Sequence, residues 1–330
     1  MSVEATTQQT EQQKSLLAAA RQLWADVTAA WAQFPHRELF WALLAVWILL
    51  FHFWGNSTFG YIKTGSLLGW MIHAYEWSPE DQHGYYMPLL VLMLLWWKRQ
   101  ELLPLPKAPW WPALGLLAIA SGLHLLGYLA QQARISILGF YLGIYAITGL
   151  LWGWLWLKKT VFPFCLLVFC VPLATQSEAI TFPLRLVATQ ITVALSHHVL
   201  GVPVIQNGTQ IFDPSGKFQY EIAPACSGIQ SLTALLVLTM IYGFVFFKPM
   251  WQRGIIVLMA VPAAIVSNVL RLLLIVAAGQ VFGQEGGNYV HNSTVLSFLP
   301  YVVGFAMVYL TGKLFTPRRV PPPAGVPEVV

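Results

Sequence analysis

Glu221-Ile-Ala-Pro-Ala-Cys226-Ser-Gly-Ile-Gln-Ser-Leu232 is the stretch in which a polar, turn-rich segment ends and a long apolar run begins. Cys226 stands at that boundary, at the expected start of a helix. Unpaired backbone N–H groups and the positive end of the helix dipole meet there, and both favour thiolate over thiol. The thiolate is the nucleophilic form of cysteine. Cys226 is therefore a candidate nucleophile, and the alternative is a small, buried apolar side chain.

The composition is that of a membrane protein with several membrane-spanning helices. Of the 330 residues, 57% are hydrophobic and only 9% are charged, whereas a soluble domain carries about 25% charged residues. The net charge of +5 does not indicate a nucleic-acid partner, because the basic residues lie where a membrane topology places them. The cysteines at positions 165, 170 and 226 show no zinc or disulfide spacing, so we expect no metal and no other cofactor.

Eight apolar runs predict the fold class, an all-α polytopic membrane protein with about eight transmembrane helices. The expected spans cover residues 39–54, 84–97, 110–130, 135–157, 161–174, 227–247, 254–280 and 295–315. Residues 55–83 are expected to be a polar loop with an apolar patch at residues 67–72. Eight spans put both termini on one side, which the positive-inside rule identifies as the cytoplasm. The basic residues that fall on this side are Lys14, Arg21, Arg37, Lys98, Arg99, Lys107, Lys158, Lys159, Lys248, Arg253, Lys313, Arg318 and Arg319.

The spans divide the chain into three parts. Residues 1–38 are a cytoplasmic N-terminal segment, residues 39–316 are the membrane domain, and residues 317–330 are a Pro-rich cytoplasmic tail that is expected to be disordered. Residues 15–34 form either an amphipathic helix on the membrane surface or a frayed polar tail. We expect no cleavable signal peptide, since the first 35 residues are polar.

An insertion at residues 175–225 is expected on the extracytoplasmic side. Its first part has apolar residues at helical spacing with polar residues between them. This pattern predicts an amphipathic helix in the outer membrane interface rather than a ninth span. Asn207-Gly208 is a preferred hairpin turn, and a second turn is expected at Asp213-Pro-Ser-Gly216. The insertion therefore predicts a small three-stranded meander that leads directly to Cys226.

Arg271 is the residue whose insertion into the membrane costs the most free energy, because it stands within the expected seventh span. A charged residue at the bilayer centre costs about 2.5 to 3.5 kcal/mol on insertion scales. The helical rise counted from Gly254 places Arg271 in the outer leaflet, at a level similar to that of Cys226. Asn268 lies three residues earlier on the same helix face, where it can orient the guanidinium group. Arg271 either serves a function or extends to the outer headgroups.

His291 is expected in the outer loop before the last span, on the same side as Cys226 and Arg271. Three such groups can carry out acyl transfer. Cys226 would attack a peptide carbonyl, and His291 would act as general base and then as acid to the leaving amine. Arg271 would donate to the tetrahedral oxyanion, with the backbone N–H of Ser227 or Gly228 as a second donor. The alternative for His291 is an ordinary loop histidine.

These residues resemble the motifs of the exosortase/archaeosortase family. The resemblance rests on Ala225-Cys-Ser-Gly-Ile-Gln-Ser-Leu232, on Asn268-Val-Leu-Arg271 and on the later His291. His83-Gly-Tyr-Tyr-Met-Pro88 is similar to the family's second-span motif. Family members often carry a glycine shortly after the later histidine, where this chain has Ser293 instead. His83 is therefore an alternative for the catalytic histidine.

The resemblance covers roughly residues 40–315 and implies a membrane cysteine protease or transpeptidase. Such an enzyme lies in the lipid bilayer of the cytoplasmic (inner) membrane with its active site on the extracytoplasmic side. Its implied substrates are exported proteins with a C-terminal sorting signal, which consists of a short Pro-Glu-Pro-like motif, a transmembrane helix and a basic tail. The alternative is a non-enzymatic membrane transport or polymer-export component. Against it, the expected spans hold no carboxylate, which ion-coupled transport usually needs.

Overall fold

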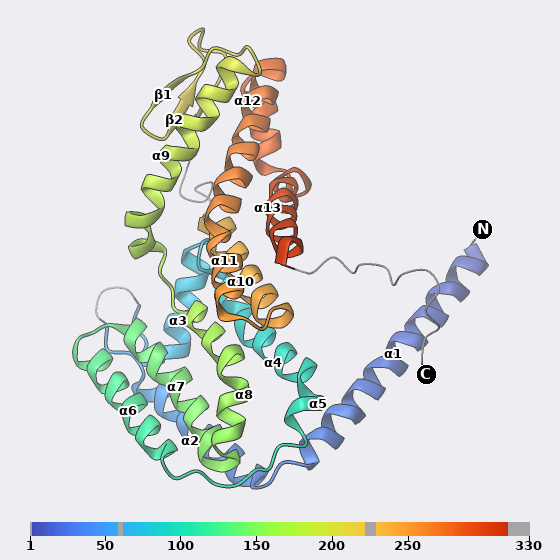
Figure 1. Cartoon of the computed structure of the whole chain (residues 1–330), viewed down its shortest axis with the longest axis vertical. Coiled ribbons are helices and arrows are strands. Elements are labelled where there is room, and N and C mark those ends of the chain that lie inside the picture. The colour runs from blue at the N-terminus through green and yellow to red at the C-terminus, as the bar shows by residue number, and fades with distance from the viewer. Residues whose placement is uncertain (1, 59–61, 222–228, 316–330) are drawn as a thin grey trace, which may run out of the picture. The chain divides into compact units, whose positions relative to one another are not determined.

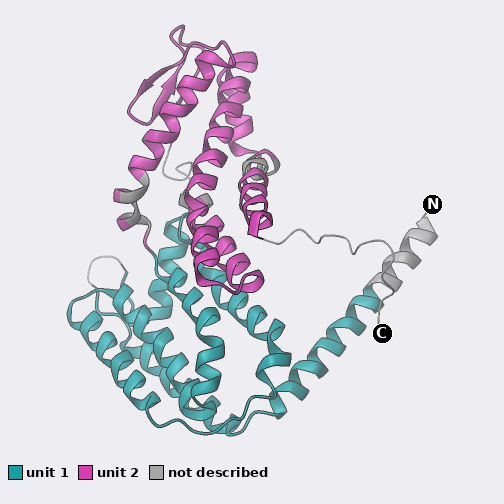
Figure 2. Ribbon diagram, in the orientation of Figure 1, with its two compact units in different colours: residues 1–172 teal, residues 173–330 magenta. Residues whose placement is uncertain are grey.

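The computed structural model describes residues 2–58, 62–221 and 229–315. The chain forms two compact units, Met1–Pro172 and Leu173–Val330 (Figure 1, Figure 2). Helices make up most of both units, and unit 2 also holds a small β-sheet.

Several helices have the length and composition of membrane spans. Among the described residues, three helical stretches are long and apolar enough to cross a membrane, namely Arg37–Trp54, Ala133–Trp152 and Met250–Asn292. Shorter apolar helices cover Met87–Trp97, Ala113–Leu129, Leu232–Phe246 and Tyr301–Phe315. The expected helical membrane fold is thereby confirmed, while the number of eight spans stays a prediction.

Unit 1 is built from helices with short connections. Its elements in chain order are α1 (Ser2–Ala32), α2 (Arg37–Trp54), α3 (Leu67–Trp77), η1 (Gln82–Tyr85), α4 (Met87–Trp97), α5 (Arg99–Leu102), α6 (Ala113–Leu129), α7 (Ala133–Trp152), α8 (Trp154–Cys165) and η2 (Leu166–Cys170). α6 and α7 pack closely, since a Cβ atom on Gly139 would lie 2.6 Å from the carbonyl oxygen of Ala120. Small residues at such contacts are typical of helices packed in membranes.

Aromatic rings join the end of α1 to α2, α7 and α8. The Trp152 ring centroid lies 4.7 Å from that of Phe34 and 4.9 Å from that of Phe40. The Trp152 Nε1–H group also donates a hydrogen bond to the Pro35 carbonyl oxygen at 3.1 Å. The helix expected at residues 15–34 is confirmed as part of α1, and its C-terminal end packs into unit 1. Its position on the membrane surface stays a prediction.

The expectation of a loop with an apolar patch between the first two spans was wrong at residues 67–77. The patch is the beginning of α3 (Leu67–Trp77). Ser66 caps this helix, because its Oγ accepts a hydrogen bond from the backbone N–H of Gly69 at 3.1 Å. A serine that pairs an otherwise unsatisfied N–H group stabilises a helix start.

The expected boundary between the fourth and fifth spans was also wrong. α7 ends at Trp152, five residues before the expected end at residue 157, because Gly153 has a φ of +93°. This is a backbone conformation that favours glycine and interrupts a helix. α8 begins directly after it, so Lys158 and Lys159 lie within α8 instead of in a loop between spans. The chain then continues as the 3₁₀-helix η2 in place of the expected end of the fifth span.

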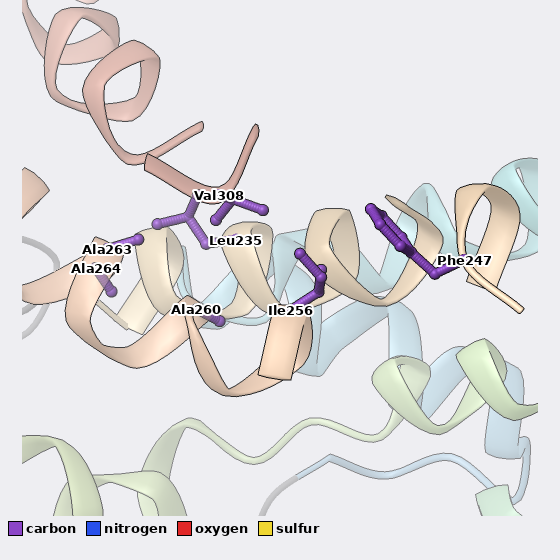
Figure 3. Packing of buried hydrophobic residues seen from close by; sticks show 7 residues of the cluster. All are labelled: Leu235, Phe247, Ile256, Ala260, Ala263, Ala264 and Val308. Atoms are coloured by element: carbon purple, nitrogen blue, oxygen red, sulfur yellow. The ribbon is translucent and has the colours of Figure 1, made fainter. Parts of the chain in front are cut away.

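Unit 2 is a helical bundle with a small sheet attached. Its elements are α9 (Ala174–His198), β1 (Ile205–Asn207), β2 (Gln210–Phe212), β3 (Gln219–Glu221), α10 (Ile229–Phe246), α11 (Met250–Leu258), α12 (Ala260–Asn292) and α13 (Thr294–Phe315). One apolar core joins α10, α11, α12 and α13 (Figure 3). Its buried residues are Leu235, Phe247, Ile256, Ala260, Ala263, Ala264 and Val308.

The predicted meander is confirmed. Three short antiparallel strands pair in the order β1-β2-β3. The turn between the first two is Gly208-Thr209, one residue later than predicted, because Asn207 still pairs with Gln210 as the last residue of β1. At the second turn the Ser215 hydroxyl donates to the Asp213 carboxylate, and this bond lowers the pKa of Asp213 below its ordinary value. The apolar side of the sheet packs on α12, where Ile211 and Phe218 share a core with Leu272 and Val276. The sheet is therefore fixed on the helix that carries Arg271.

In the part of α9 whose side chains are described, three hydroxyl side chains are buried and several apolar side chains are exposed. Thr189, Thr192 and Ser196 are fully buried, whereas Val187 and Ile191 are exposed. A helix on the surface of a soluble protein has the opposite arrangement. Outward-facing apolar residues suit an apolar environment, and the expected position of α9 in the outer membrane interface stays a prediction.

Candidate active site

α12 carries Asn268, Arg271 and His291, three of the predicted site residues. Arg271 and His291 are 20 residues apart, which in a continuous helix corresponds to about 30 Å. Nevertheless Nη2 of Arg271 donates a hydrogen bond to the carbonyl oxygen of His291 at 3.4 Å. The chain therefore turns back at Gly283, the residue of α12 with non-helical angles. We call residues 260–282 the outgoing arm of α12 and residues 284–292 the returning arm.

His291 lies on the returning arm, so the expectation of a loop at this position was wrong. Its ring Nδ1 is 3.1 Å from Oδ1 of Asn292. An amide oxygen only accepts hydrogen bonds, so a hydrogen bond between these two atoms requires the proton on Nδ1 and leaves Nε2 as the basic nitrogen of the neutral ring. A general base at His291 would therefore act through Nε2.

Tyr220 from strand β3 fills the space between the two arms of α12. Its hydroxyl donates to the Gln284 carbonyl oxygen at 3.0 Å. A Cβ atom on Gly279 of the outgoing arm would lie 2.9 Å from this hydroxyl, and one on Gly287 of the returning arm only 2.0 Å from it. Both glycines thus leave room for the Tyr220 ring. Through the Tyr220 side chain, the meander therefore contacts both the arm that carries Arg271 and the arm that carries His291.

The Arg271 side chain is half-buried, and its Nε atom is fully buried without a hydrogen-bond partner among the described residues. A buried donor without a partner costs about 1 to 3 kcal/mol, so such groups call for an explanation. Asn268, three residues earlier, is 6% exposed and lies on the same helix face. A buried guanidinium group of this kind is able to bind a developing negative charge on a ligand oxygen.

The N-terminus of α10 lies close to the level of Arg271. Both Ser267 Oγ and Leu235 Cδ1 lie next to Gly304, at 2.5 Å and 3.1 Å from the position of a Cβ atom there. α10 runs antiparallel to α11 and α12, because Gly243 near its end lies next to Arg253 and Ile256, whereas the earlier residue Leu235 lies near the later residue Ser267. Arg271 is four residues beyond Ser267, which corresponds to about 6 Å of helical rise along α12. Ile229 is six residues before Leu235, which corresponds to about 9 Å in the same direction along α10. The first residue of α10 therefore lies within roughly 3 Å of the level of Arg271.

The predicted nucleophile Cys226, together with Ser227 and Gly228, lies outside the described residues, in the connection between β3 and α10. His83 belongs to unit 1, in η1, where its Nδ1 donates to the Glu80 carbonyl oxygen at 2.9 Å. Its Nε2 is thus also the proton-accepting nitrogen. The choice between His291 and His83 stays a prediction.

Gly283→Ala is expected to destabilise unit 2. Gly283 has φ 70° and ψ −164°, a combination that only glycine adopts easily, and a side chain there costs roughly 1 to 3 kcal/mol. The matched control is Gly254→Ala in α11, where a Cβ atom would meet nothing within 4 Å and alanine favours the helix by up to about 1 kcal/mol. Thermal unfolding in detergent should show a lower midpoint for the first variant and an unchanged or higher one for the second. Equal midpoints would contradict the strained turn.

Sequence reasoning missed Gly283, Gln284 and Tyr220 as residues that shape the site. The sequence does contain a signal, since Gly283, Gly286 and Gly287 stand close together at the end of an apolar run. Clustered glycines indicate a turn or a close approach of two chain segments. The partner in that approach, Tyr220, was visible only as a residue of a short strand.

The fold and the site define a helical protein with the composition of a membrane protein, in which the guanidinium group of a half-buried arginine contacts the backbone of a histidine beside a small meander. The family model of the transmembrane exosortase matches residues 74–310, which is more than half of the chain. The chain therefore belongs to the transmembrane exosortase family, as the motifs had indicated. No curated protein and no solved structure gives a significant match. Membership in this family identifies a membrane protein with a transpeptidase- or protease-type role, which acts on exported proteins in a lipid membrane.

Proposed function

We propose that this chain is a cysteine peptidase or transpeptidase that cleaves the C-terminal sorting signal of exported proteins. Cys226 is the nucleophile, His291 the general base and acid, and Arg271 the donor to the oxyanion. The active site faces the extracytoplasmic side of the cytoplasmic membrane, and both termini lie in the cytoplasm. The one-sided distribution of lysine and arginine supports this orientation.

The reaction proceeds through a thioester. Nε2 of His291 takes the thiol proton of Cys226, the sulfur forms a bond to the substrate carbonyl carbon, and the oxyanion binds to the guanidinium group of Arg271. The C–N bond then breaks, and the imidazolium group gives its proton to the leaving amine. Water or an amine acceptor attacks the thioester in the second step, which releases the Cys226 thiol. Asn268 orients Arg271, and the backbone N–H of Ser227 or Gly228 is the second oxyanion donor.

The observation that carries this proposal is the hydrogen bond from the Arg271 guanidinium group to the backbone carbonyl oxygen of His291, at about the level where α10 begins. Cys226 belongs to the connection that joins β3 to α10, and β3 is itself held between the arms of α12. One end of this connection thus follows the strand that contacts the arm of His291, and the other end lies at about the level of Arg271. The buried Nε of Arg271 adds a donor without a partner among the described residues.

The substrate signal consists of a short Pro-Glu-Pro-like motif, a transmembrane helix and a basic tail. A helix followed by basic residues takes the orientation that the positive-inside rule gives, with its tail in the cytoplasm and the motif on the outer side. The cleaved bond then lies at the outer membrane surface, at the proposed level of Cys226. The alternative is that the chain is a non-enzymatic transport or polymer-export component. Such a protein would form no acyl-enzyme intermediate.

A trapping experiment with hydroxylamine tests the proposal. The purified protein is incubated in lipid with a substrate that carries the signal, and the new C-terminus is analysed by mass spectrometry. Hydroxylamine attacks a thioester, so a fraction of the product should end in a hydroxamate that grows with hydroxylamine concentration. The Cys226→Ala variant should give none. A product that ends only in a carboxylate at every concentration would contradict a thioester intermediate.

A further inference from the structure

Strand β3 lies at the edge of the meander, and the side chain of Gln284 covers this edge. In the part of the chain that the structure describes, the sheet order β1-β2-β3 leaves one side of β3 without a neighbouring strand. There the backbone N–H of Gln219 donates to Oε1 of Gln284 at 2.8 Å, and Nε2 of Gln284 donates to the Gln219 carbonyl oxygen at 2.9 Å. The amide of one side chain thus replaces the peptide group of a further strand, which satisfies both backbone groups of Gln219.

The chemistry of the partners fixes the orientation of the Gln284 amide. A backbone N–H only donates and a backbone carbonyl only accepts, so Oε1 must face the first group and Nε2 the second. The second hydrogen of Nε2 points to Oδ1 of Asn288 on the same arm, at 3.4 Å. The hydrogen-bonding groups of the Gln284 side chain are therefore used in one definite arrangement, which favours a rigid connection.

Gln284 stands where the strand that leads to Cys226 meets the arm that leads to His291. It is the first residue after the turn at Gly283, and His291 follows on the same arm. β3 ends at Glu221, only a few residues before Cys226. Two further bonds join this region to α12. The Tyr220 hydroxyl donates to the Gln284 carbonyl oxygen on the returning arm, and Nζ of Lys217, which precedes β3, donates to the Gln280 carbonyl oxygen on the outgoing arm.

We propose that Gln284 is a positioning residue for the reaction, which fixes β3, the strand that precedes Cys226 in the chain, against the arm that carries His291. The inference rests on the proposed function, because it concerns the same nucleophile. Gln284 acts through the backbone of β3 and takes no part in proton transfer. Its loss would leave the strand held by Tyr220 and Lys217 but without the two hydrogen bonds that fix the register of β3 against the returning arm.

The test compares Gln284→Ala with Gln219→Ala. The first variant removes both bonds to β3, whereas the second keeps them, because only backbone atoms of Gln219 take part. A misplacement of reacting groups by about 1 Å costs on the order of 100-fold in rate. We expect the kcat for signal cleavage to fall about 10- to 100-fold in Gln284→Ala with little change in KM, and Gln219→Ala to stay within about twofold of the wild type.

The outcomes separate this inference from the proposed function. Cys226→Ala is measured in parallel, and if it cleaves at the normal rate, the proposed nucleophile is wrong and Gln284 has nothing to position. If Cys226→Ala is inactive while Gln284→Ala keeps the wild-type kcat, or while both glutamine variants lose activity equally, the positioning role is refuted. Should Gln284→Ala fail to accumulate in the membrane, Gln284→Met keeps the length of the side chain without its hydrogen bonds and is judged by the same kcat and KM criteria.

Discussion

Replacing Cys226 by alanine should lower the rate of signal cleavage by at least about 10⁴-fold, because removal of the nucleophile of a covalent mechanism leaves only substrate binding and oxyanion stabilisation. Cells that carry an exported protein with a tagged C-terminal signal would accumulate the uncleaved precursor. Cys226→Ser should be nearly as inactive, since a hydroxyl is a much weaker nucleophile than a thiolate at neutral pH. Immunoblots of precursor and product over time measure both variants.

Cys165→Ala is the matched control for this experiment. Cys165 is a free, exposed cysteine of unit 1, and exposed substitutions change stability by about 0.5 kcal/mol or less. Cleavage should therefore stay within about twofold of the wild type. Cys170 is buried and is a poorer control, because its truncation would also leave a cavity. If Cys226→Ala processes the substrate as fast as Cys165→Ala, another group is the nucleophile.

Arg271→Ala is expected to reduce kcat by about 10² to 10³-fold, the usual cost of losing one donor to the oxyanion. The effect should appear in kcat more than in KM, because the guanidinium group bonds to a charge that develops only in the transition state. Arg271→Lys should restore little of the activity. A lysine ammonium group lacks the planar fork that reaches both an oxyanion and the His291 carbonyl oxygen. Steady-state cleavage of a synthetic signal peptide in lipid nanodiscs measures these constants.

Ser267→Ala is the control for Arg271, because it lies one turn away on the same face of α12. The Ser267 hydroxyl is buried and has no hydrogen-bond partner among the described residues. Replacing Ser267 by alanine removes a buried polar group that makes no hydrogen bond there, so the change should leave the free energy of unfolding the same or raise it slightly. The kcat should be unaffected. Equal losses in Arg271→Ala and Ser267→Ala would mean that any change on this helix face disturbs packing, and the assigned role of Arg271 would fail.

The sequence by itself determined the helical membrane class, the approximate position of most helices and the meander. Long apolar runs and the preference of Asn207-Gly208 for a hairpin turn are properties of neighbouring residues, which is why they can be read without a structure. The motifs around Cys226, Arg271 and His291 likewise indicated the family that residues 74–310 confirm. Boundaries were less well predicted, as at Gly153, where one glycine ends α7 before the apolar pattern does.

Only the tertiary structure decided how the parts of the site meet. The return of the chain at Gly283 brings the His291 carbonyl oxygen to the guanidinium group of a residue 20 positions earlier, where the sequence predicted only a loop after residue 280. The contact of Gln284 with the edge of β3 joins two segments that are 65 positions apart. Such pairs depend on which surfaces pack against each other in three dimensions, whereas helical and strand periodicity report only which face of each element is apolar.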